Sequence, residues 1–71
     1  MTVYVEYIMK DGSNRWAVEP VTIDSIDSSL LDIRMALFKA VQSSYPAFND
    51  PYELDIIDIK EKLEDFFVPN N

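Results

Sequence analysis

Residues 50–67, DPYELDIIDIKEKLEDFF, decide the fold because they carry signals for both a helix and a strand. Asp50, Pro51 and Glu53 stand where an N-cap, a first-turn proline and a capping-box acid belong. At about 100° per residue, the apolar side chains of the segment also gather on one side of a helix. The members of this stripe are Tyr52, Ile56, Ile59, Leu63, Phe66 and Phe67. The segment therefore predicts a C-terminal helix.

A competing interpretation makes residues 52–59 a strand and begins a short helix at Lys60. Ile56, Ile57 and Ile59 have the β-branching that is typical of strands. Strict alternation, however, places Asp58 on the same face as Ile56 and puts Ile59 on the opposite face. The helix fits this pattern better. We therefore expect an α+β domain in which an N-terminal β-hairpin packs on two helices (ββαα), with ββαβ, in which residues 52–59 form a third strand, as the alternative.

The N-terminal part of the chain predicts the hairpin. Thr2 to Lys10, TVYVEYIMK, is rich in β-branched and aromatic residues that alternate between two faces. The turn residues DGSN at 11–14 follow, and RWAVEPVTI at 15–23 resumes the extended pattern. Pro20 cannot donate a ladder hydrogen bond, so the second strand ends there, bulges or lies at a sheet edge.

A helix is predicted from Leu30 to about Ser44. Ser29 begins an approximate capping box, and Pro46 marks the end of the helix. The apolar arc of this helix is wide enough to need cover on two sides. Its members are Leu30, Leu31, Ile33, Met35, Leu37, Phe38, Val41 and Tyr45. Arg34 projects into the arc, so either its head reaches an acidic neighbour at the surface or it marks a contact surface.

Composition indicates one domain, residues 1–71, near the lower size limit for independent folding. Thirteen acids against six bases give a formal charge of -7, which argues against direct contact with nucleic acid or an anionic membrane and favours a basic partner. Cysteine is absent, and no apolar run approaches the roughly 20 residues that span a bilayer. We therefore expect a cytoplasmic protein.

The residues needed for common catalytic chemistry are missing. The chain has no histidine and one glycine, so it lacks the usual neutral-pH acid/base and any phosphate-binding glycine loop. The run DSIDSS at 24–29 does not begin an EF-hand loop, which needs a glycine at its sixth position and an acid at its twelfth. The chain has Ser29 and Met35 at these positions. We expect no enzyme activity, no cofactor and no metal site.

The distribution of acids points to a binding surface. If the C-terminal segment is helical, Asp58, Glu61 and Asp65 align along one face at spacings of three and four. Leu54, Ile57 and Val68 fall on the same outward side, which makes an aliphatic seam bordered by carboxylates. We expect this seam to bind a partner, with Arg34 as a further contact.

These features predict a small inhibitor or regulator that occupies a basic site on another protein, for example a site that binds nucleic acid. Bacteriophages encode proteins of this sort against host machinery. One alternative is an adaptor that adds its hairpin edge to a partner sheet. The order VYVEYIM, DGSN, RWAVEP and a capped helix is similar to the opening of ubiquitin-like β-grasp domains over residues 1–45, but no diglycine tail follows, so conjugation is not inferred. The other alternative is an obligate homodimer or a subunit of a larger assembly.

Overall fold

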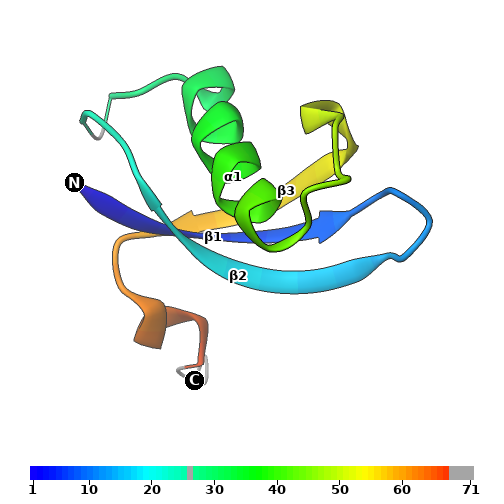
Figure 1. Ribbon diagram of the computed structural model, residues 1–71. Coiled ribbons are helices and arrows are strands. Elements are labelled where there is room, and N and C mark those ends of the chain that lie inside the picture. Colours follow the sequence, from blue (N-terminus) through cyan, green and yellow to red (C-terminus); the bar gives the residue numbers. More distant parts are fainter. Residues whose placement is uncertain (26, 68–71) are drawn as a thin grey trace.

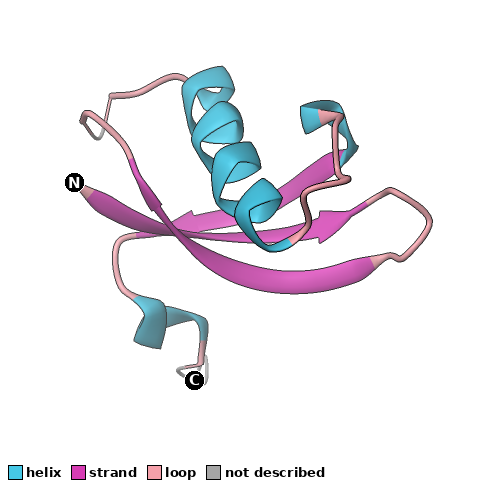
Figure 2. Ribbon diagram, viewed as in Figure 1, coloured by secondary structure: helices cyan, strands magenta, loops and turns pink. Residues whose placement is uncertain are grey.

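The computed structural model describes residues 1–25 and 27–67, which form a three-stranded antiparallel sheet with one α-helix on one face (Figures 1 and 2). The elements in chain order are β1 (Thr2–Met9), β2 (Arg15–Thr22), α1 (Leu30–Ser44), the 3₁₀ turn η1 (Pro51–Glu53), β3 (Leu54–Lys60) and the 3₁₀ turn η2 (Leu63–Phe66). The strand order is β2-β1-β3, so β1 is central. None of the described helices has the length and apolar character needed to cross a membrane.

The predicted hairpin is confirmed. β1 and β2 pair over their whole length, from Thr2 opposite Thr22 to Met9 opposite Arg15. In the connecting turn, the Asp11 carboxylate accepts hydrogen bonds from the backbone N–H of Ser13 (3.1 Å) and from its hydroxyl (2.6 Å). These bonds hold the pKa of Asp11 below its ordinary value. Positive φ at Gly12 (100°) and at Asn14 (50°) lets the chain reverse, because both residue types tolerate that region.

The first predicted helix is also confirmed, with its predicted start and end. The Ser29 hydroxyl accepts a hydrogen bond from the backbone N–H of Asp32 at 3.1 Å, as an N-cap should. α1 ends at Ser44, one residue before the C-cap Tyr45 and two before Pro46. One stripe of the helix, Ile33, Leu37 and Val41, is buried against the sheet.

The predicted C-terminal helix is wrong. Residues 54–60 form β3, so ββαβ describes the fold and ββαα does not. The residues that predicted a helix start do begin a helical turn, but only a short one. The Asp50 carboxylate accepts a hydrogen bond from the backbone N–H of Tyr52 at 2.9 Å, and Pro51 begins the turn η1. Ile56 and Ile59 then pair with Tyr7 and Val5 of β1, and their side chains pack against the core.

A β-bulge explains why strict alternation fitted this strand poorly. Tyr7 pairs with Ile56, whereas its neighbour Glu6 pairs with Asp58, so Ile57 is an extra residue with no partner on β1. The bulge reverses the phase of β3, and Ile59 comes opposite Val5 on the same face as Ile56. A regular strand would have directed the Asp58 carboxylate into the core.

The core lies between α1 and the sheet. Its buried side chains are Val3, Val5, Tyr7, Met9, Val21, Ile23, Ile33, Leu37, Val41, Phe48 and Leu54. Phe48, from the connection after α1, lies with its ring centroid 5.8 Å from that of Phe38. Gln42 fixes this connection by donating from Nε2 to the Phe48 carbonyl at 3.1 Å.

Tyr7 is the core residue whose ionisation should be measurable. Burial, followed by the negative charge of Glu19, raises the pKa of Tyr7 to about 12. The charged phenolate is disfavoured because it would lie out of water and beside a carboxylate.

We predict that the free energy of unfolding falls as the pH rises from 10 to 12, because the unfolded tyrosine ionises near pH 10 while folded Tyr7 keeps its proton up to about pH 12. The contribution is fully present below pH 10 and amounts to at most about 2–3 kcal/mol. Urea denaturation across this range should show a smaller decline for Tyr7→Phe than for the parent protein. An equal decline in the free energy of unfolding of both proteins would contradict the raised pKa of Tyr7.

Candidate functional site

The sheet has a second face, turned away from α1, which we call the outer face. The register assigns to it the side chains that alternate with the core residues of β1, together with their partners on β2 and β3. Besides the pair Thr2 and Thr22, they form three rows that cross all three strands: Pro20, Tyr4 and Lys60; Val18, Glu6 and Asp58; and Trp16, Ile8 and Asp55.

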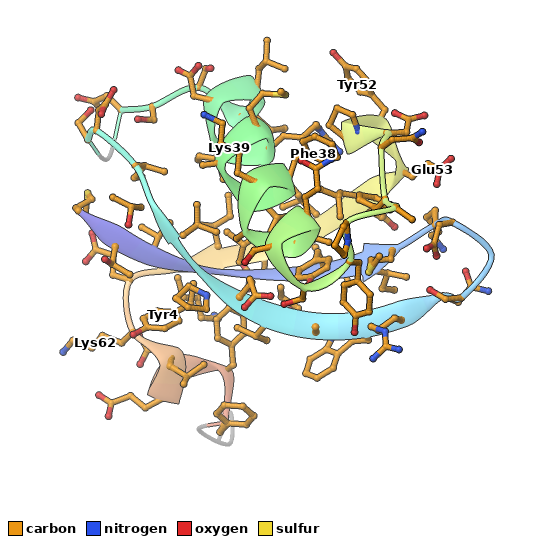
Figure 3. The ribbon with its side chains drawn as sticks, viewed as in Figure 1. Tyr4, Phe38, Lys39, Tyr52, Glu53 and Lys62 are labelled. Atoms are coloured by element: carbon orange, nitrogen blue, oxygen red, sulfur yellow. The ribbon has the colours of Figure 1, made fainter. Side chains whose placement is uncertain are left out.

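The C-terminal segment covers only one end of the outer face. Figure 1 shows η2 on the side of the sheet opposite to α1. A hollow between this segment and β1 is lined by Tyr4, Glu61, Lys62, Leu63, Glu64 and Phe67, and Figure 3 shows Tyr4 and Lys62 on this side. Lys60 Nζ lies 5.4 Å from the centroid of the Phe66 ring, which fastens the segment to the Tyr4–Lys60 row. Among the described residues, no other element lies over the remaining two rows.

We call these two rows the open patch: Glu6, Ile8, Trp16, Val18, Asp55 and Asp58. Trp16 is its largest side chain, and it is 52% exposed. Its indole Nε1–H donates to Glu6 Oε2 at 2.8 Å, which fixes the position of the ring on the sheet. A large aromatic side chain held rigidly at the surface loses little entropy on binding, and tryptophan is among the residues that contribute most to protein interfaces.

The charge of the open patch is negative and unusually arranged. Glu6 and Asp58 are direct cross-strand neighbours, a placement that is unfavourable for two like charges. Each carboxylate has a different partner: Trp16 donates to Glu6, while Lys60 Nζ lies 3.3 Å from Asp58. Asp58 also accepts the backbone N–H of Ile59 at 2.8 Å. One lysine therefore stands against the three carboxylates of the patch, so an incoming cation would be attracted.

The structure separates the residues of the predicted aliphatic seam. Leu54 is 1% exposed, opposite Met9 in the core, so the expectation that it faces outward is wrong. Ile57, at the bulge, is 49% exposed and accessible to a partner. Val68 lies outside the described residues. Leu54 and Ile57 differ in exposure because the segment is a strand and not a helix.

The three predicted acids do not align along a helix. Asp58 is in β3 on the outer face, Glu61 follows that strand, and Asp65 lies in η2. All three are exposed. Only Asp58 belongs to the open patch, while Glu61 lines the hollow at the covered end.

Arg34 joins α1 to the start of β3. Its Nη1 donates to the carbonyl oxygens of Pro51 (3.1 Å) and Leu54, and its guanidinium carbon lies 5.7 Å from the centroid of the Tyr52 ring. We expected the Arg34 head to reach an acidic neighbour. Its hydrogen bonds in the structure go instead to these two backbone carbonyls.

Trp16, Glu6 and Ile8 were not singled out from the sequence. The available signal was that β1 is apolar on both faces, since Tyr4 and Ile8 alternate with Val5 and Tyr7. A strand that is apolar on both faces requires a second cover, and here that cover is incomplete.

The described residues contain no group of three or more histidine, cysteine or acidic side chains placed to hold a metal ion. No protein-family model matches the chain, and no curated protein or solved structure matches it significantly.

Because Leu54 is buried and Ile57 is exposed, replacing each by alanine should lower the free energy of unfolding by different amounts. Leu54→Ala should lower the free energy of unfolding by about 2–5 kcal/mol because it leaves a cavity in the core. Ile57→Ala removes an exposed side chain and should cost well under half as much. Urea denaturation of the two variants measures both values, and similar losses would contradict the assignment of residues 54–60 to a strand.

Proposed function

We propose that the protein is a non-enzymatic binding module that places its open patch on a basic surface of a partner protein and thereby acts as a small inhibitor or regulator. One observation carries the proposal: exposed Trp16 shares the uncovered part of the outer face with the three carboxylates of Glu6, Asp55 and Asp58.

The patch combines two sources of binding free energy. Trp16, Ile8 and Val18 supply apolar area, which stabilises a complex by about 25 cal/mol per Å² removed from water. A lysine or arginine of the partner could approach the carboxylates and also lie over the indole ring. Charge complementarity chiefly raises the association rate and selects the partner.

The net charge of -7 extends this argument beyond the patch. A groove that binds nucleic acid is both basic and partly apolar, so it is the kind of partner surface that fits best, with the protein acting as a mimic of nucleic-acid charge. We place this function in the cytoplasm, in keeping with the absence of cysteine.

The edges of the sheet are less suited to binding than its face, which disfavours the adaptor alternative. On β2, Pro20 removes one N–H from the outer edge of the ladder. On β3, the bulge interrupts the edge, and the Asp58 carboxylate already accepts the N–H of Ile59. A partner strand would therefore find an incomplete row of hydrogen-bonding groups on either side.

Titration with a short synthetic peptide of alternating arginine and leucine tests the proposal, with ¹⁵N-labelled protein observed by NMR. We expect the largest shift changes at the Trp16 indole N–H and at the backbone amides of the open patch. Asp55→Lys should weaken binding roughly tenfold, because an attraction becomes a repulsion. The affinity should also fall as salt rises.

Asp24→Lys is the matched control, since it changes the net charge equally at an exposed position in the connection between β2 and α1. It should weaken peptide binding much less than Asp55→Lys. Equal losses for the two variants, or shift changes spread evenly over the acids of the chain, would refute the open patch as the binding site.

A further inference from the structure

We infer that the exposed side of α1 is a homodimer interface in which the α1 helices of two copies pack antiparallel. The starting observation is that apolar residues stand at the middle of the helix face that should be polar. Leu31 is 52% exposed and Met35 39%, although α1 already buries its other side on the sheet. A helix that packs on one side only normally exposes polar residues on the other.

Helical geometry places these residues together. At about 100° per residue, Leu31, Met35 and Lys39 fall within about 80° of one another, on the side opposite to the buried stripe. Asp32 lies at the edge of the same face. Asp32 and Lys39 are both exposed, and neither forms an ion pair with any part of the chain that the structure describes.

The positions of these two charges favour a second copy as the occupant. Asp32 and Lys39 are equally distant along α1 from the midpoint between Met35 and Ala36. A two-fold axis through that midpoint would bring Asp32 of each copy beside Lys39 of the other, with the Met35 side chains packed between the two ion pairs and Leu31 just outside them. Such an interface is self-complementary, as a symmetric dimer requires.

Net charge supports the same choice. Two copies with a charge of -7 each repel one another over most of their surfaces. The exposed face of α1 carries one acid and one base, so the repulsion is weakest there. On one flank, Tyr52 extends the apolar surface, and Figure 3 shows its side chain projecting away from the sheet.

The size of the interface implies a weak, concentration-dependent dimer. α1 has 15 residues, which corresponds to a helix about 22 Å long, and a single helix pair lies at the low end of specific interfaces. α1 lies on one face of the sheet (Figure 1), and the register places the open patch on the other face, so the dimer would leave both open patches accessible. The inference therefore stands independently of the proposed function.

Sedimentation velocity over a series of concentrations, with the full chain, tests the inference. The parent protein should shift from monomer to dimer as its concentration rises. Asp32→Lys and Lys39→Asp should each weaken dimerisation roughly tenfold, because each replaces two ion pairs by two like-charge contacts. The double variant, which restores the pairing with the charges exchanged, should dimerise within a few-fold of the parent.

Trp16→Lys is the control for dimerisation through the open patch, and it should dimerise like the parent. Circular dichroism would establish that every variant keeps its fold. A parent protein that is monomeric at all concentrations would overturn the inference. So would a dimer that resists both single reversals, a double variant that stays monomeric, or a dimer that is lost on Trp16→Lys.

Discussion

The pairing of β3 with β1 through the bulge at Ile57 is the constraint on which the rest of the structure depends. In β3, polar and apolar residues do not alternate regularly. The bulge lets Ile56 and Ile59 pack on the α1 side of the sheet while Asp58 faces the opposite side. The bulge costs one unpaired residue on the strand, which is a smaller loss than an isolated carboxylate in the core of a domain this small. The same pairing makes β1 the central strand and creates the outer face.

The fold consequently presents two surfaces with different properties. α1 covers one face of the sheet and exposes Leu31 and Met35 beside Asp32 and Lys39, a combination that suits a second copy of the chain. The outer face holds Trp16 and three carboxylates with little cover, a combination that suits a cationic partner. A dimer formed through α1 would carry two open patches, and simultaneous binding at both would raise the apparent affinity for a partner with repeated basic sites.

Local signals predicted the parts of the fold that depend on neighbouring residues. The hairpin follows from alternation and turn residues, and the start of α1 follows from Ser29, whose hydroxyl caps the helix as expected. The faces to which the side chains of β3 point could not be predicted from its own sequence, because a bulge is determined by what the partner strand buries and not by the bulged segment alone. The helix interpretation of this segment placed Leu54 on the surface and aligned Asp58, Glu61 and Asp65 along one face. The exposure of Trp16 was not predicted because it depends on how much of the outer face the C-terminal segment covers.

The most direct test of the account is a solution NMR measurement of nuclear Overhauser effects for residues 54–60. The bulged pairing predicts cross-strand contacts between the backbones of Tyr7 and Ile56 and between those of Val5 and Ile59. Glu6 should show the contacts of a direct partner with Asp58 and not with Ile57. Amide contacts between successive residues through 54–60, together with contacts to residues three positions along the chain, would show a helix instead. That result would contradict the core, the open patch and the function proposed for it.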